Sequence, residues 1–200
     1  MEMKKIIFAT SNEGKMKEIR EIFKCTGYEI VSMKEAGLKL SIEENGKTFT
    51  ENALIKARAV AKAAGVISLA DDSGLEVDYL DRAPGIYSAR FMGSDTSYEI
   101  KNRYILDKLK GIPEEKRTAR FACAIAIVFP DGKEDTAFAT IEGRIAYEPA
   151  GENGFGYDPI FFVPEFGKTS AQLSMDEKNK ISHRGKALEI IKKKYFTDRL

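Results

Sequence analysis

The sequence predicts a mixed α/β fold that forms one domain over residues 1–200. Two lobes that flank a cleft are one possible form of this domain. Three observations predict the fold. Apolar residues recur at helical spacing in several segments, and short apolar runs bounded by turns lie between these segments. In one long segment, apolar residues stand at every second position, as in a strand. A composition of 43% hydrophobic and 32% charged residues excludes a disordered or collagen-like chain.

The chain opens with a strand, a polar turn and a helix. A short apolar run predicts a buried strand over residues 4–9, and the polar segment Thr10–Lys15 follows as a turn with capping residues. Met16, Ile19 and Phe23 then recur at three- and four-residue steps, so they share one face of a helix.

Further helices are predicted over residues 50–64, 98–109 and 184–195, where apolar side chains share a face. A strand over residues 66–70 follows the first of them and is expected to end at Asp71-Asp72-Ser73-Gly74. Two adjacent acids at the end of a buried strand are costly to desolvate unless a cation compensates them. We therefore expect a cationic group close to this segment.

The segment 120–145 is predicted to be a long hairpin. Its apolar residues alternate, Pro130-Asp131-Gly132 supplies the turn, and residues 136–145 return as the partner strand. A Gly-rich loop at 151–156 and a short strand at 160–163 follow.

Two common nucleotide-binding motifs are excluded. Each of the two Gly-Lys-Thr triplets lacks the Gly that a P-loop needs five places earlier, where Ser41 and Phe162 stand. The run that starts at Gly154 has Pro159 where a dinucleotide fingerprint needs its third Gly.

Two segments favour a phosphate and a metal. Thr10–Lys15 lies between a strand and a helix, where backbone N–H groups and the helix dipole attract an anion, although a plain helix cap with a surface lysine fits the same pattern. Asp71 and Asp72 suit Mg²⁺, or they cap a turn. Glu43 and Glu44 are candidates for a second metal ligand, or they lie in a solvated loop.

Two further segments carry side chains that suit stacking on a planar ring and hydrogen bonding to a ligand. Phe155 and Tyr157 can stack on a base or pack in the core. His183 and Arg184 can donate to a carbonyl oxygen or a phosphate. A serine hydrolase built on Ser182 is disfavoured, because no nucleophile elbow is present.

Charge and cysteine content limit the partners and the compartment. A net charge of +1 and the absence of a dense basic stripe disfavour binding to nucleic acid. No apolar run is long enough for a membrane span or a signal peptide, so we expect a cytoplasmic protein. Cys25, Cys123 and a single His cannot build a disulfide framework or a zinc cluster.

Taken in order along the chain, five segments resemble the inosine triphosphate pyrophosphatase family. They are Thr10-Ser11-Asn12-Glu13-Gly14-Lys15, Ala70-Asp71-Asp72-Ser73-Gly74-Leu75, Ser88-Ala89-Arg90-Phe91, Gly154-Phe155-Gly156-Tyr157-Asp158-Pro159 and Ser182-His183-Arg184. The resemblance runs from Ile6 to about Ile191, with Phe91 where the family frequently has Tyr. Several unrelated motifs in one order are far more specific than any single one.

The resemblance implies a long mixed β-sheet with helical lobes flanking a central nucleotide-binding cleft, in a homodimer. It implies Mg²⁺-dependent hydrolysis of ITP, dITP and XTP to the nucleoside monophosphate and pyrophosphate. Asp72 matches the proton acceptor and metal ligand, and Glu43 matches the second metal carboxylate, with Glu44 adjacent. The substrate-binding residues carried over are Thr10, Ser11, Asn12, Glu13, Gly14, Lys15, Lys56, Ser73, Phe155, Gly156, Tyr157, Asp158, Lys178, His183 and Arg184.

Base preference is expected to follow hydrogen-bond polarity. A 6-oxo purine presents an acceptor to donors such as His183 and Arg184, whereas adenine presents an amino group there. Two alternatives remain open. One is a pyrophosphatase of the related Maf type that acts on modified pyrimidine or other nucleotides, and the other is a nucleotide-binding regulator without turnover.

Overall fold

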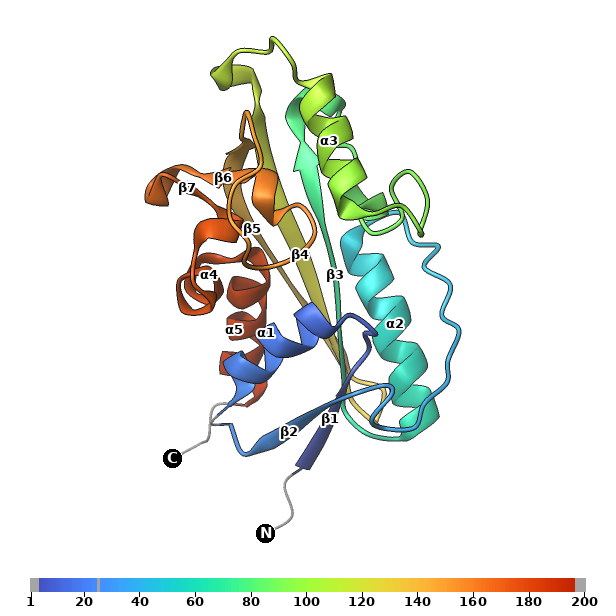
Figure 1. Ribbon diagram of the computed structural model, residues 1–200. Helices are drawn as coiled ribbons and strands as arrows, with labels where there is room; N and C mark the ends of the chain where they lie inside the picture. Colours follow the sequence, from blue (N-terminus) through green and yellow to red (C-terminus); the bar gives the residue numbers. More distant parts are fainter. Residues whose placement is uncertain (1–3, 25, 197–200) are drawn as a thin grey trace. The chain divides into compact units, whose positions relative to one another are not determined.

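The computed structural model describes residues 4–24 and 26–196 (Figure 1), so Cys25 lies outside the described residues. The helices are α1 (Glu13–Phe23), α2 (Phe49–Ala64), α3 (Tyr98–Lys108), α4 (Met175–Ile181) and α5 (His183–Tyr195). The strands are β1 (Lys4–Phe8), β2 (Tyr28–Ser32), β3 (Ser68–Val77), β4 (Thr118–Val128), β5 (Glu134–Ile145), β6 (Phe161–Val163) and β7 (Lys168–Thr169). No helix of these ranges is long and apolar enough to cross a bilayer.

The strands form one mixed sheet in the order β2-β1-β3-β4-β5-β6-β7. β1 runs parallel to both β2 and β3, whereas β6 runs antiparallel to β5 and β7. The predicted α/β fold with a long mixed sheet is therefore confirmed.

The chain divides into two compact units. Unit 1 takes the chain up to Asp72, then Cys123–Ala139 and the part from His183 onward, while unit 2 takes Ser73–Ala122 and Thr140–Ser182. Each unit has its own hydrophobic core. The core of unit 1 includes Phe8, Ile19, Leu69, Ile125 and Leu188. The core of unit 2 includes Leu75, Ile105, Phe121, Ile160 and Phe161.

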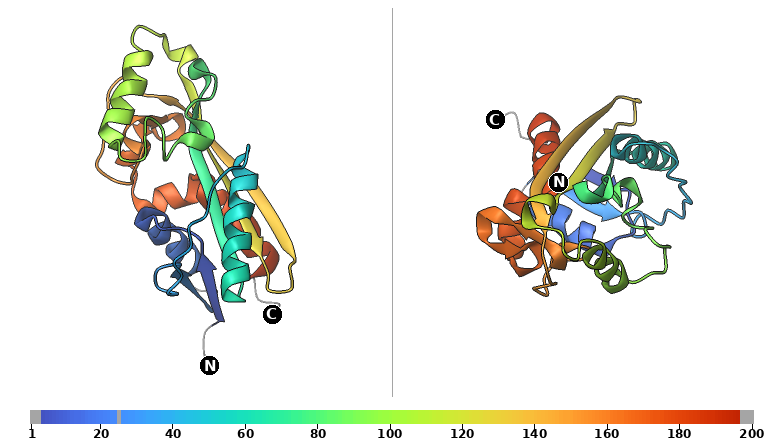
Figure 2. Two further views of the ribbon diagram at one scale, coloured as in Figure 1. Left: turned by 90° about the vertical axis from the view of Figure 1, so that its right-hand side faces the viewer. Right: turned by 90° about the horizontal axis from the view of Figure 1, so that it is seen from above.

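In unit 1, helices cover both faces of the parallel strands. α1 and α5 lie together on one face, and α2 lies on the other (Figures 1 and 2). Thr48 caps the start of α2 and Gly65, in the left-handed conformation, ends it. This double covering explains why β1 is apolar without alternation from Ile6 to Phe8.

The predicted end of the strand over residues 66–70 is wrong. β3 does not end before Asp71 but continues through the acidic segment to Val77. Its later apolar residues, Leu75 and Val77, are fully buried. Cationic side chains surround the acids, so the strand passes through them without leaving two uncompensated buried charges.

Three short elements were not predicted, namely β2, β7 and α4. α4 is a seven-residue helix, MDEKNKI, too short and too polar to show a helical apolar stripe. The first helix also begins earlier than expected, since Asn12 caps it and places Gly14 and Lys15 in its first turn.

Candidate active site

The carboxyl end of β1 is a natural binding position in this fold. β1 lies between β2 and β3 in the sheet. The chain passes from β1 to β2 on one side and then crosses through α2 to β3 on the other side. Open α/β sheets bind ligands where the strand order reverses in this way. The predicted phosphate segment starts there. Thr10 Oγ1 accepts from the Asn12 N–H, and Asn12 Oδ1 accepts from the Lys15 N–H, both at 3.1 Å. Asn12 caps the Lys15 N–H, so the N–H groups of Glu13 and Gly14 in the first turn of α1 are left for an anion.

Asp71 and Asp72 face opposite sides of β3, because successive side chains of a strand alternate. Asp71 lies on the side of α1 and α5. Its Oδ2 is 3.0 Å from Lys15 Nζ and accepts from Arg184 Nε at 3.1 Å. Burial raises the pKa of Asp71, but Lys15, Arg184 and Lys56 outweigh burial and hold the pKa well below its usual range.

Arg184 is enclosed by acidic partners of its own unit. Its Nη1 pairs with Glu18 and its Nε with Asp71, and only 2% of the residue is exposed. Burial disfavours the charged guanidinium, yet Glu18 and Asp71 raise its pKa above the ordinary value. Direct contact of Arg184 with a substrate stays a prediction. His183, its neighbour at the start of α5, is also buried.

Asp72 lies on the side of α2. Asn52 Nδ2 donates to its Oδ2 at 3.1 Å, and Lys56 Nζ lies 3.5 Å from its Oδ1. Lys56 Nζ is also 3.2 Å from Glu44 Oε2. Burial raises the pKa of Asp72, and the nearby negative charge of Glu44 raises it further. Lys56 and Lys15 lower this pKa, but the net result is a raised pKa. We call Lys15, Lys56, Asp71, Asp72 and Arg184 the acid–lysine cluster.

Lys56 remains a cation despite its burial. Burial lowers its pKa, but Asp72, Asp71 and Glu44 raise it more, so the net pKa lies above its ordinary value. Asn52 and Lys56 are one helical turn apart and therefore share the face of α2 that meets Asp72.

The described contacts do not gather the predicted metal carboxylates in one place. Asp72 is buried against Asn52 and Lys56, and Glu44 reaches the same lysine. Glu43 is exposed, and no contact in the described chain brings its side chain to Asp72. In residues 4–24 and 26–196, no group of three or more His, Cys, Asp or Glu side chains gathers as a metal site. Two carboxylates with water and phosphate oxygens suit Mg²⁺, which keeps several such ligands.

The predicted ring-binding segment lies in unit 2 and is organised by Asp158. The buried carboxylate of Asp158 accepts from Lys178 Nζ at 2.7 Å and from the Phe155 N–H and Ser170 Oγ, both at 2.8 Å. A Cβ on Gly154 would stand 2.2 Å from this carboxylate, so the loop can close around Asp158 only with glycine there. Asp158 thus links the loop at Phe155 to Ser170 and to Lys178 of α4.

The two aromatic residues of the loop have different surroundings. Lys178 Nζ lies 5.0 Å from the centroid of the half-buried Phe155 ring. Tyr157 is only 3% exposed, and its hydroxyl donates to the Ser88 carbonyl at 2.8 Å. Phe155 therefore suits the predicted stacking, whereas Tyr157 belongs to the core of unit 2. Ser73, the next residue of β3 after Asp72, is half-buried.

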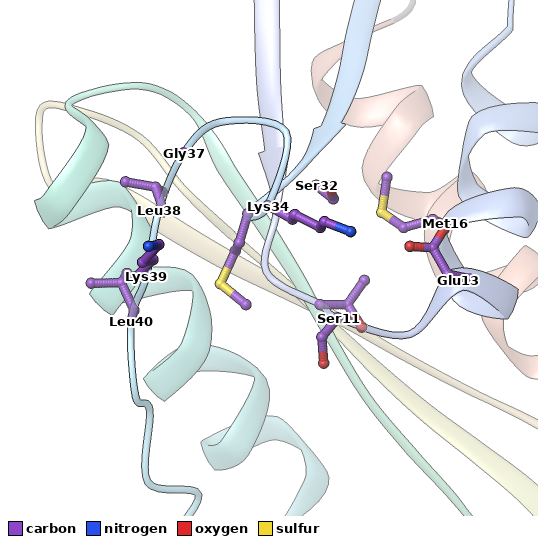
Figure 3. A pocket seen from close by; sticks show the side chains of 11 residues that line it. Ser11, Glu13, Met16, Ser32, Lys34, Gly37, Leu38, Lys39 and Leu40 are labelled. Atoms are coloured by element: carbon purple, nitrogen blue, oxygen red, sulfur yellow. The ribbon is translucent and has the colours of Figure 1, made fainter.

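A cavity of about 300 Å³ lies beside the turn in unit 1 (Figure 3). Thr10, Ser11 and Glu13 line it from the turn, and Met16 and Leu38 supply apolar surface. Lys34 and Lys39 are also lining residues, and Lys34 extends toward Glu13 and Met16 in Figure 3. Lysines beside the turn add to the positive character that its backbone provides.

Several residues of these clusters were not found from the sequence. Asn52 could have been found from its four-residue spacing to Lys56 on a helix, next to the acidic strand. Glu18 and Ser170 carry no such signal, because their partners Arg184 and Asp158 are distant in sequence. The direct pairing of Lys15 with Asp71 was likewise visible only in three dimensions.

Comparison with known proteins gives concordant matches. The model of the Ham1 family matches residues 6–194. A dITP/XTP pyrophosphatase of Bacillus subtilis is 51% identical over 191 residues, 96% of each chain. Another from Desulforamulus reducens is 51% identical over 185 residues, 92% of each chain.

Solved structures agree with these matches. The Ham1 protein of Staphylococcus aureus superimposes with a TM-score of 0.84 and 43% identity, over 95% of this chain and 97% of that one. A HAM1 protein from Coxiella burnetii gives a TM-score of 0.86 with 40% identity, over 96% and 98% of the two chains.

Proposed function

Because the chain belongs to the Ham1 family, we propose that it has the activity for which its bacterial relatives are named. It hydrolyses non-standard purine nucleoside triphosphates, namely ITP, dITP and XTP, to the nucleoside monophosphate and pyrophosphate. The enzyme thereby removes deaminated purines from the nucleotide pool. The family resemblance carried by the five motifs is confirmed.

The observation that carries the chemistry is the placement of Asp72 against Asn52 and Lys56. Burial raises the pKa of the Asp72 carboxyl, which makes its ionised form a better base than an exposed aspartate. Asp72 accepts the proton of the attacking water, and Asn52 fixes the orientation of the carboxylate. No covalent intermediate on the protein is needed.

The cations of the acid–lysine cluster face the charge of the triphosphate. Lys56 keeps its proton at neutral pH and neutralises phosphate oxygens near Asp72. Lys15 and the first N–H groups of α1 attract a phosphate at the end of β1. We assign the leaving pyrophosphate to these two lysines, together with the turn residues Thr10–Gly14.

We propose Mg²⁺ as the cofactor. Asp72 and Glu43 would hold it, while Glu44 keeps Lys56 in place. When bound, Mg²⁺ supplies Lewis-acid stabilisation of charge on the phosphate oxygens. The donors are hard carboxylates, which favour Mg²⁺ over softer metals.

We assign recognition of the purine to the loop 155–158 and its neighbours. The half-buried ring of Phe155 offers a stacking face, and Lys178, fixed by Asp158, offers a donor beside it. Donors favour a 6-oxo purine over adenine, because adenine would leave them facing an amino group. His183 and Arg184, which belong to unit 1, stay predicted donors to a substrate oxygen.

We propose a cytoplasmic homodimer that binds neither nucleic acid nor membranes. The balanced net charge of +1 supports the absence of a polyanion partner. Unit 2 exposes large apolar side chains, which a second protomer would cover. They include Tyr79, Tyr87, Met92, Ile100 and Tyr104.

The test is to incubate the purified chain with Mg²⁺ and ITP, XTP, GTP or ATP and to identify the products. We expect pyrophosphate from ITP and XTP, with discrimination against ATP as large as about 10⁴. Release of orthophosphate, or equal rates with ATP, would overturn the proposal. Selective hydrolysis of modified pyrimidine nucleotides would favour a Maf-type enzyme, and binding without turnover would favour a regulator.

A further inference from the structure

Helix α3 supports the loop that precedes Asp158, within unit 2. Asn102 Nδ2 on this helix donates to the carbonyl oxygen of Gly156 at 3.1 Å. Tyr98, one turn earlier, packs edge to face on Tyr157 with ring centroids 5.2 Å apart. A Cβ on Gly156 would stand 3.5 Å from the Tyr98 ring, so the loop backbone lies directly against the helix.

Tyr157 is fixed separately at its hydroxyl. It donates to the Ser88 carbonyl, and the next carbonyl along, that of Ala89, accepts from the buried Lys101 of α3 at 2.7 Å. The Tyr157 side chain is therefore held at both ends. Asn102 adds a different constraint, because it holds the peptide group between Gly156 and Tyr157.

Stability alone does not explain an asparagine at position 102. The residue is 7% exposed, and its Oδ1 has no hydrogen-bond partner among the residues that the structure describes. A buried amide oxygen without a partner costs free energy. Gly156 is half-buried, so water can replace the Asn102 amide at its carbonyl. Leucine would fill a similar volume without a buried polar atom.

We propose that Asn102 is a positioning residue for purine recognition, acting through Gly156 on the loop that carries Phe155. The inference rests on the proposed function of that loop. Asn102 orients the peptide group that follows Gly156 and thereby sets the angle at which the Phe155 ring meets the base. We expect no contribution to the binding of phosphates, because the contact of its side chain is with Gly156 and not with the acid–lysine cluster.

The test compares inhibition by IMP with inhibition by pyrophosphate in Asn102→Leu and Asn102→Asp. Each variant lacks the amide donor. We expect the inhibition constant of IMP and the KM for ITP to rise about 5- to 10-fold, the effect of one lost hydrogen bond. Inhibition by pyrophosphate should stay within about 2-fold, since Asn102 shares no contact with the residues assigned to pyrophosphate. The thermal midpoint of Asn102→Leu should stay within about 3 °C of the wild type.

Two comparisons separate positioning from general damage. Arg103→Ala changes an exposed neighbour on the same helix and should leave both inhibition constants unchanged. Tyr157→Phe removes the hydroxyl bond to Ser88 and should weaken IMP binding in the same direction as the Asn102 variants. If Asn102→Leu does not fold, Asn102→Asp carries the comparison, because it preserves the side-chain size.

The inference is overturned if IMP binds the Asn102 variants as tightly as the wild type. It is also overturned if IMP and pyrophosphate weaken together with a large loss of thermal stability, which would show a merely structural role. A wild-type chain that releases no pyrophosphate from ITP would instead refute the proposed function, and the inference with it.

Discussion

Two neighbouring carboxyl groups in β3 have opposite electrostatic surroundings. Lys15 and Arg184 contact Asp71, and together with Lys56 they keep its pKa low in spite of burial. Asp72 is turned to the other face, where burial and Glu44 leave its pKa raised. Asp71 is therefore a permanent anion that anchors cations, and Asp72 is the group suited to exchange a proton.

We expect the adjacent glutamates Glu43 and Glu44 to have different functions, one as a metal ligand and the other as the partner of Lys56. Glu43→Gln should raise the free Mg²⁺ concentration for half-maximal turnover on the order of 10-fold, because a proposed ligand is lost. Glu44→Gln should leave that concentration nearly unchanged and raise the KM for ITP, because Lys56 loses its partner at 3.2 Å. The measurement is a Mg²⁺ titration of ITP hydrolysis, with the reverse pattern contradicting the assignment.

At the residue scale, the sequence predicted the groups whose chemistry is local. Thr10–Lys15 and Asp72 stand out because each follows an apolar run of the sequence. The sequence could not predict that Arg184 is buried against Glu18 and Asp71, since these contacts span more than a hundred residues. Nor could it separate the core position of Tyr157 from the half-buried position of Phe155.

At the scale of elements, segments with a clear apolar pattern were predicted, whereas the short elements β2, β7 and α4 were not. α2, α3, α5 and the hairpin of β4 and β5 lie close to their predicted bounds, because each has a clear apolar pattern. β3 was predicted too short, because Asp71–Gly74 has the composition of a turn. Tertiary ion pairs override that local preference.

A link between β2 and α1 should make stability depend on acidic pH. Glu35 accepts from the Ser32 N–H and hydroxyl and from Arg20 of α1. These hydrogen bonds lower the pKa of Glu35 from 4.5 to about 2. The bond from the Ser32 N–H has the largest effect, followed by those from Arg20 and the Ser32 hydroxyl. Its stabilising contribution is therefore present above the ordinary pKa and lost as the pH falls from about 4.5 to about 2.

Glu35→Gln should accordingly be less stable than the wild type at neutral pH, and the difference should vanish near pH 2. Urea unfolding across the acidic range measures it, with the exposed Glu152→Gln as the control. A difference that stays constant down to pH 2 would contradict the assigned role of Glu35.

The cap of α2 should matter for stability. Thr48 Oγ1 accepts from the Glu51 N–H at 3.1 Å at the start of this helix. Thr48→Ala should destabilise the chain by about 1 kcal/mol. The thermal midpoint should then fall by about 2–4 °C, and Thr48→Ser should restore it. An unchanged midpoint for Thr48→Ala would show that tertiary packing alone fixes the helix start.

At the scale of the whole molecule, the charge of Asp72 has opposing effects on stability. Burial raises the pKa of this carboxyl, so the folded state disfavours its ionised form. The same charge is the carboxylate that most raises the pKa of buried Lys56, so its removal leaves that cation with fewer partners. The same change removes the proposed base and a proposed metal ligand.

The most direct measurement is ITP turnover by Asp72→Asn, together with its thermal midpoint. We expect kcat to fall by about 10²- to 10⁴-fold, while the variant stays folded, with one cooperative thermal transition. Near-normal release of pyrophosphate from ITP by this variant would show that Asp72 is not the base that accepts the proton of the attacking water.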